Sequence, residues 1–128
     1  MLEINLTGKK VFIAGIGDDQ GFGFAIAKTL FQAGAKIYVG TWAPIYKIFT
    51  TAWQNGKFDH SRLCADGTLL ELEKIYPIDA CYDSIEDVPP AIKTNKRYQH
   101  VTDYGTKELA QLLKKDLGTL DLLLHSLA

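Results

Sequence analysis

The sequence predicts an α/β fold, a doubly wound parallel sheet with helices on both faces. Short apolar runs typical of buried strands alternate with segments whose apolar residues recur every three to four positions, as in amphipathic helices. The first run is followed at once by a glycine-rich turn and a helical pattern. Because parallel crossovers are right-handed, this order of elements predicts strands arranged 3-2-1-4.

The first strand leads into the glycine-rich turn. Residues 11–14 form the apolar run, and the residues after it are rich in Gly and Asp. A helix follows, because Ile26, Leu30 and Ala33 recur at helical spacing and Gly34 stands where a C-cap is expected. Strand, glycine-rich turn and helix are typical of a dinucleotide-binding βαβ unit, in which backbone N–H groups and the helix dipole face a pyrophosphate.

The spacing of the glycines departs from the strict G-x-G-x-x-G pattern. Gln20 stands three positions after Gly17, and the glycines instead follow Gly15-x5-Gly21-x-Gly23. This spacing still predicts a close approach of the backbone to a phosphate. The alternative is a strand-to-helix turn whose glycines serve only its shape, since such turns occur in many α/β folds.

A second strand is predicted over residues 36–40, ending at Thr41-Trp42. An acidic residue often binds the adenosine ribose at this point, and none is present here. Trp42 either stacks on an adenine ring or only seals the edge of the sheet, and the residues alone favour neither interpretation.

The following helix is expected to begin near Pro44 and to end at Gly56. Its apolar positions form a stripe typical of core residues, namely Ile45, Ile48, Phe49, Ala52 and Trp53. Residues 56–72 are interpreted as an insertion that the fold does not require, with a small hairpin around Asp66-Gly67. The third strand is predicted over residues 74–78, with Pro77 at its end.

The rest of the chain supplies a loop, a helix and a fourth strand. Residues 83–103 are polar and predict a solvated loop, and the less favoured alternative is that their basic group, Lys93, Lys96 and Arg97, contacts an acidic partner. A helix begins at Asp103 or Thr106, ends at Gly118 and presents Leu109, Leu112, Leu113 and Leu117. Residues 120–124 are apolar throughout, which predicts a strand covered on both faces.

Composition excludes several classes of protein. The chain has 128 residues, enough for one domain, and a net charge of −1, which disfavours nucleic acid as a partner. Cys64 and Cys81 show no metal-ligand spacing and are expected to be reduced thiols. No run approaches the ~20 apolar residues of a membrane helix, and no secretory signal begins the chain. We therefore expect a cytoplasmic protein with no metal and no membrane partner.

Several separated motifs resemble one family, the NADH-dependent enoyl-[acyl-carrier-protein] reductases of the short-chain dehydrogenase/reductase superfamily. The motifs occur in order at Gly15 to Lys28, Val39 to Trp42, Tyr76 to Ala80, Pro89 with Lys93 to Tyr98, and Leu124 to Ala128. The glycine spacing, two residues longer than the common short-chain pattern, is that of the family. The insertion at 56–72 resembles the plant-type branch.

The resemblance implies a Rossmann-type domain that binds NAD (NADH), and it implies roles at matching positions. Gly15, Ile16, Gly21 and Phe22 would line the pyrophosphate and the adjoining ribose. Trp42 would flank the adenine, and Asp79 and Ala80 would meet the adenine edge. Ser126, Leu127 and Ala128 would pass beneath the cofactor near the nicotinamide.

The implied activity belongs to type II fatty-acid synthesis. Hydride from NADH would reach a trans-2-enoyl thioester carried on acyl carrier protein, and the full-length enzyme would be a homo-oligomer, a tetramer in this family. The family's Tyr-x6-Lys catalytic pair is absent from these residues. We therefore expect an incomplete sheet at the C-terminal end, the N-terminal half of a Rossmann domain. On its own it should be inactive, bind NADH weakly at best and self-associate at micromolar concentration.

Two alternatives stay open. Another short-chain reductase, such as one acting on 3-oxoacyl thioesters, is disfavoured because such enzymes usually carry Asn-Asn-Ala-Gly where Ser126-Leu127-Ala128 stand. A non-catalytic dinucleotide-binding module, for example a redox sensor, would explain the absence of a catalytic pair.

Overall fold

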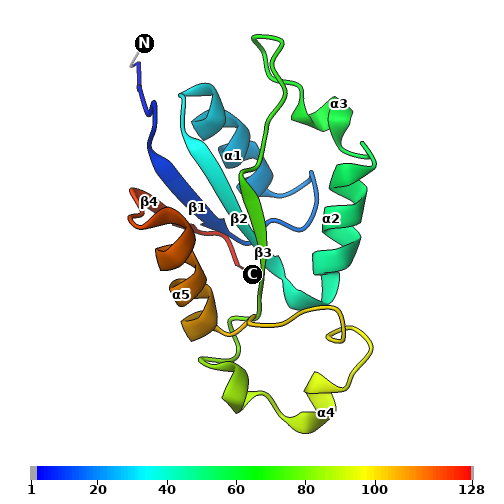
Figure 1. The fold of residues 1–128 in the computed structure, drawn as a ribbon. Helices are drawn as coiled ribbons and strands as arrows, with labels where there is room; N and C mark the ends of the chain where they lie inside the picture. Colours follow the sequence, from blue (N-terminus) through cyan, green and yellow to red (C-terminus); the bar gives the residue numbers. More distant parts are fainter. Residues whose placement is uncertain (1–2, 128) are drawn as a thin grey trace.

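The computed structural model describes residues 3–127, which form one parallel sheet with helices on both faces (Figure 1). The strands are β1 (Lys10–Ala14), β2 (Lys36–Trp42), β3 (Lys74–Ile78) and β4 (Leu122–His125). Their order is β3-β2-β1-β4, and every pairing is parallel. The predicted fold class and strand order are therefore confirmed.

The helices occupy the crossovers between the strands. They are α1 (Phe22–Gln32), the 3-10 turn η1 (Ala43–Ile45), α2 (Tyr46–Gln54), α3 (Asp59–Arg62), the 3-10 turn η2 (Ile85–Asp87), α4 (Pro90–Lys93) and α5 (Thr106–Leu117). No helix of residues 3–127 is long and apolar enough to cross a membrane.

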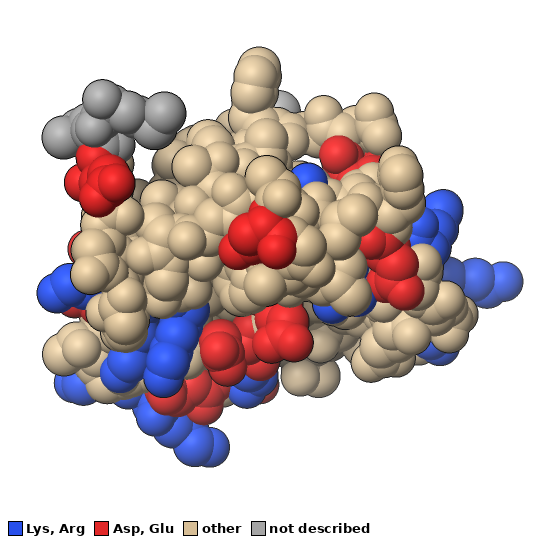
Figure 2. All heavy atoms as spheres, turned by 90° about the horizontal axis from the view of Figure 1, so that it is seen from above, with Lys and Arg blue, Asp and Glu red and all other residues tan. Residues whose placement is uncertain are grey.

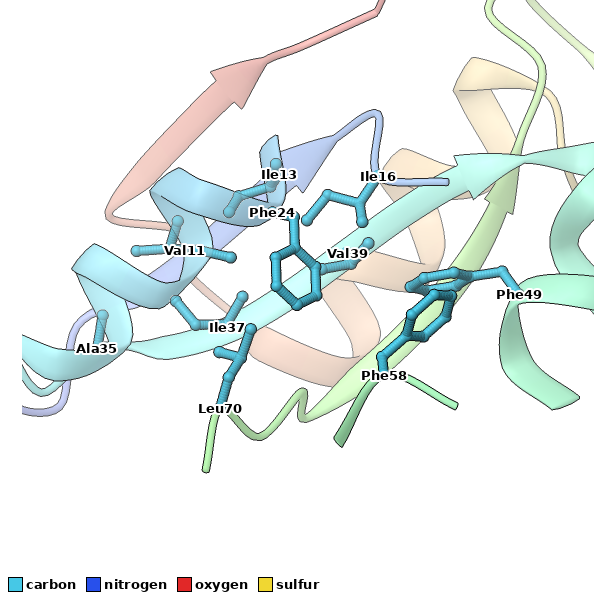
Figure 3. Packing of buried hydrophobic residues seen from close by; sticks show 11 residues of the cluster. Val11, Ile13, Ile16, Phe24, Ala35, Ile37, Val39, Phe49, Phe58 and Leu70 are labelled. Carbon is cyan, nitrogen blue, oxygen red and sulfur yellow. The ribbon is translucent and has the colours of Figure 1, made fainter. Parts of the chain in front are cut away.

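One face of the sheet packs against α1 and α2. Side chains that alternate along β1 and β2 point to this face, as the two-residue period of a strand requires, and meet Phe24 of α1 and Phe49 of α2 (Figure 3). Phe49 also contacts Phe58, with ring centroids 5.7 Å apart. Most of the predicted stripe of α2 is core, but Ile48 is 68% exposed and lies outside it.

The other face of the sheet is covered by α5. Phe12, Tyr76 and Ile78 of the sheet are buried with Leu109 of α5. The Tyr76 hydroxyl donates to Asp116 Oδ2 at 2.7 Å, and Lys74 Nζ reaches the same oxygen at 2.8 Å. These contacts hold α5, the helix that the leucine spacing predicts, against the outer strand β3.

The predicted insertion at 56–72 packs into the core of this chain. Phe58 and Leu70 are buried in the same cluster as β1, β2 and α1. The predicted hairpin is present only as a single antiparallel bridge between Leu63 and Leu69, with Gly67 at a φ of +87° in its turn. The short helix α3 was not predicted, because four residues are too few for a periodic pattern.

Most residues of the segment 83–103 are exposed, as its polarity predicts, but the segment also contains η2, α4 and two buried valines. Val88 and Val101 are buried with Tyr104 and with Ala43 of η1 in a third cluster. Figure 1 shows the segment around α4 below the sheet. Val88 and Val101 are too far apart in the sequence to form a periodic pattern, so their burial arises from long-range packing.

The two outer strands differ from expectation in detail. Pro77 lies inside β3, paired with Thr41, and an edge strand tolerates it because one side of the strand forms no ladder. The apolar strand β4 was expected to be covered on both faces, yet Leu122 and Leu123 are 41% and 68% exposed. Within residues 3–127, β4 is the other edge of the sheet.

Candidate functional site

The carboxyl ends of all four strands border one cavity. Its volume is about 550 Å³, and it lies at the edge of a parallel sheet where ligands of doubly wound folds bind. Lining residues predicted from the sequence are Gly15, Ile16, Trp42, Asp79, Ala80, Ser126 and Leu127. The fold therefore brings together seven of the ten predicted residues, which come from four separate segments of the chain.

Gly15 permits close contact between the ends of β1 and β4. Its φ is +114°, and a Cβ there would lie 2.6 Å from the carbonyl carbon of Ser126 and closer still to its oxygen. The N–H groups of Gly15 and Ile16 both donate to the Gly40 carbonyl, at 2.9 and 3.1 Å. No side chain fits at Gly15, so the floor of the cavity is backbone.

The N-terminus of α1 is open to a ligand. Gly21 is the N-cap and provides no side-chain hydrogen bond, and the first turn contains no acidic residue. A Cβ on Gly21 would meet nothing within 4 Å, and the Phe22 side chain is 85% exposed. Gly21 and Phe22 do not line the cavity itself. They border the uncapped N–H groups of α1, where a phosphate is stabilised.

Asp19 of the glycine-rich turn points towards the insertion. Its carboxylate accepts a short hydrogen bond from the Ser61 hydroxyl, and this bond is the main cause of the lowered pKa of Asp19. The contact directs the carboxylate of Asp19 towards the insertion and holds α3 beside the glycine-rich turn. Sequence reasoning missed it because 42 residues separate the two partners.

Trp42 stands at the end of β2, is 43% exposed and lines the cavity. The Arg97 guanidinium lies over the ring, 4.9 Å from its centroid, as in a cation–π pair. Arg97 does not line the cavity, so it supports the indole from outside. This pair could not be predicted, since Arg97 belongs to a segment expected to be solvated.

Asp79 is 4% exposed and already has two hydrogen-bond donors. Its Oδ2 accepts from the Tyr98 hydroxyl at 2.7 Å, and its Oδ1 accepts from the Cys81 N–H at 3.1 Å. Burial and the bond to Asp79 raise the pKa of Tyr98, so its hydroxyl keeps the proton it donates. Each carboxylate oxygen has a second lone pair, which leaves room for one more donor from the cavity.

The remaining wall comes from the end of β4. The Ser126 N–H donates to the Ala14 carbonyl at 2.8 Å, extending the β1–β4 pairing to the cavity. Ala128, the tenth predicted residue, lies outside the described residues. Four lining residues were not predicted, although each adjoins a predicted residue or begins the next helix: Gly17, Ile45, Ile78 and Cys81.

The side chains around the cavity suit the binding of a ligand. Asp79 raises the pKa of the exposed Cys81 thiol and so keeps it protonated. No group of His, Cys, Asp and Glu within residues 3–127 is arranged to hold a metal ion. An aromatic ring, a buried acceptor and exposed helix N–H groups fit the base and the phosphates of a dinucleotide.

Comparison with known sequences gives a consistent result. No family model matches the chain. It is 54% identical over 127 residues to the chloroplastic enoyl-[acyl-carrier-protein] reductase [NADH] of Arabidopsis thaliana, and 54% identical to reductases 1 and 2 of Oryza sativa subsp. japonica, both also chloroplastic. These alignments cover 99% of this chain but only 33–34% of the relatives, so the chain spans about a third of their length.

Solved structures agree. The structure of Plasmodium berghei enoyl-acyl-carrier-protein reductase with triclosan matches 94% of this chain and 42% of its own, with a TM-score of 0.88 and 36% identity. An Anaplasma phagocytophilum enoyl reductase in complex with NAD matches with a TM-score of 0.58 at 15% identity, covering 95% of this chain and 34% of its own, which supports the fold alone. By sequence and by fold, this chain is similar to one part of the NADH-dependent enoyl-[acyl-carrier-protein] reductases, about a third of the length of the plant enzymes.

Proposed function

We propose that this chain is the cofactor-binding part of an NADH-dependent enoyl-[acyl-carrier-protein] reductase of type II fatty-acid synthesis. The observation that carries the proposal is the single cavity that joins the glycine-rich turn, Trp42, Asp79 and Ser126 at the carboxyl edge of the sheet. Its 54% identity to plant reductases named for NADH supports the same cofactor.

The residues around the cavity fit NADH in one orientation, with the adenine at Trp42 and the nicotinamide near Ser126. The adenine stacks on the Trp42 ring, and Asp79 accepts from the exocyclic amine of the base. The pyrophosphate lies over Gly15, Ile16 and the open N-terminus of α1, with Gly21 and Phe22 beside it. Ala80 completes the adenine side. Ser126 and Leu127, with Ala128 after them, pass beneath the nicotinamide end.

NADH supplies hydride in the proposed reaction. The hydride reaches the β-carbon of a trans-2-enoyl thioester on acyl carrier protein, the C=C π electrons move to give an enolate, and a proton at the α-carbon completes the reduction. None of the chain's six tyrosines has a lysine four or seven positions later, so this chain lacks the family's Tyr–Lys pair for the enolate step. Its own residues bind and orient the cofactor.

A second candidate is a dinucleotide-binding module without catalysis, favoured by the same missing Tyr–Lys pair. Turnover in the full-length protein separates the two proposals. The cytoplasmic location stays a prediction, and the chloroplastic names of the plant relatives favour a plastid instead. A homotetramer likewise stays a prediction.

We expect the protein to prefer NADH to NADPH. No Lys or Arg follows β2 directly, and Trp42 fills the place where a 2′-phosphate partner would stand. The fold does bring Arg97 near, but the guanidinium lies outside the cavity, against the indole. The test is kcat/KM with each cofactor in the full-length protein. Arg97→Gln should leave the preference for NADH in place, and an equal or higher kcat/KM for NADPH in the unmodified protein would contradict the assignment.

Gly21→Ala separates binding from folding. A Cβ at Gly21 would have no atom within 4 Å, and the φ of −89° is one that alanine adopts readily. The free energy of unfolding should therefore change by less than ~0.5 kcal/mol. The same methyl group would crowd a pyrophosphate seated on α1 and should weaken NADH binding by about 1–3 kcal/mol. Urea unfolding and NADH titration of one preparation measure both. Unchanged affinity would place the pyrophosphate elsewhere.

A further inference from the structure

A second concave surface lies away from the candidate cofactor cavity. It runs between α2 and the segment after α4, has a volume of about 680 Å³, and is lined by Ala43, Pro44, Lys47, Ile48, Thr51, Ala52, Asn55, Lys57, Lys96, Arg97, His100 and Val101. We call it the α2 groove. None of its residues belongs to the predicted site, and it shares none with the cofactor cavity.

The charged side chains that line the α2 groove are all positive. Four of its lining residues are Lys or Arg and none is Asp or Glu, although the whole chain has a net charge of −1. Neither ion pair found within residues 3–127 involves these four cations. Elsewhere charges are mixed, and Figure 2 shows Lys and Arg beside Asp and Glu on the face seen from above. A local excess of positive charge in a chain of net negative charge favours a localised acidic partner over a long polyanion.

The groove also has an apolar strip. Ile48 is 68% exposed on the outer side of α2, and Ala52 lies one turn further along. The wall formed by α2 from Lys47 to Asn55 is about 12 Å long at 1.5 Å per residue, the length of two helical turns. Lysines on both walls flank this strip, Lys47 on α2 and Lys96 on the opposite segment.

We propose that the α2 groove docks an acidic amphipathic helix of another protein. An apolar side chain of that helix covers Ile48, and its carboxylates face Lys47 on one wall and Lys96 on the other. A free phosphate would satisfy the charges but not the apolar strip, and an apolar helix would leave the cations facing it without counter-charges. The proposal does not rest on the cofactor assignment, because the two sites share no lining residue, and the test uses Lys47, Ile48 and Lys96 but not Arg97, which contacts Trp42 of the cofactor cavity.

The test uses the chain tethered at low density on a biosensor surface, so that exposed β4 leucines of different molecules do not meet. The probe is a synthetic peptide of about 16 residues with Leu and Glu at helical spacing. A peptide of identical composition, scrambled out of helical register, is the control. We expect saturable binding of the helical peptide and much weaker binding of the scrambled one.

Charge-reversal variants test whether the helical peptide binds in the α2 groove. Lys47→Glu with Lys96→Glu should weaken the helical peptide about tenfold, and Ile48→Ser should weaken it without changing charge. The matched control, Lys107→Glu with Lys115→Glu on α5, makes the same change in net charge on another exposed surface and should leave binding within about twofold. All these residues are exposed, so the variants should fold as the parent does. Absence of binding, equal binding of the scrambled peptide, or equal loss in the α5 control would overturn the proposal.

Discussion

Gly15→Ala is expected to destabilise the protein by about 3–5 kcal/mol, a large share of the stability of a domain this size. The new methyl group would collide with the Ser126 carbonyl, which is backbone and cannot rotate away, and the φ of +114° disfavours any L side chain. Relief would require β1 and the end of β4 to separate at the cavity floor. The measurement is chemical unfolding followed by circular dichroism.

Gly21→Ala is the matched control for Gly15→Ala. Both substitutions add one methyl group to the same glycine-rich turn, but at Gly21 the space is open. Equal stabilities of the two variants would show that Ser126 does not lie against Gly15. An insoluble Gly15→Ala variant beside a well-folded Gly21→Ala variant would agree with the collision.

Asp79→Ala should cost about 2–4 kcal/mol of folding stability in addition to its effect on NADH binding. The substitution leaves the partly buried Tyr98 hydroxyl and the Cys81 N–H without their acceptor. The sequence places Asp79 at the end of a strand, where a carboxylate is expected to contribute little to packing. In the structure Asp79 is only 4% exposed, so it does have a structural role. Urea unfolding of the variant gives the stability difference.

Tyr98→Phe is the matched control for Asp79→Ala. It removes only the hydroxyl that donates to Asp79 and leaves the carboxylate in place, so the loss of stability should be smaller, about 1–2 kcal/mol. NADH affinity should fall in Asp79→Ala and change little in Tyr98→Phe. A larger effect of Tyr98→Phe on NADH binding than of Asp79→Ala would mean that Asp79 serves the loop and not the cofactor.

Local patterns predicted the elements, and the sheet order followed from them. The run before Gly15, the spacing of Ile26 and Leu30 and the glycine after α1 each act over a few residues, so the strand, the turn and the helix could be recognised one after another. The strand order then needed only the right-handed crossover rule. The glycine-rich turn and the end of the second strand single out Gly15 and Trp42 directly, whereas Asp79, Ala80, Ser126 and Leu127 were predicted only through the family resemblance.

Contacts between distant segments could not be predicted. Tyr98, which donates a hydrogen bond to Asp79, lies 19 residues away in the sequence. Arg97 contacts Trp42 from a segment whose polar composition predicts solvent exposure. Ser61 fixes Asp19 across 42 residues. Each of these residue types occurs in several environments in proteins. Their contacts are determined by how residues 83–103 and the insertion pack against the rest of the chain. The α2 groove was missed for this reason too, since its cations come from two separate segments.

Saturation-transfer NMR with NADH tests the central claim most directly, because it detects weak binding and reports which end of the ligand touches the protein. With the chain in solution, the adenine H2 and H8 protons should receive more saturation than the nicotinamide protons, since Trp42 and Asp79 lie in the wall of the cavity. Trp42→Ala should remove most of the adenine signal. Stronger saturation of the nicotinamide, or an adenine signal that survives Trp42→Ala, would contradict the assignment of this cavity to the adenine end of NADH.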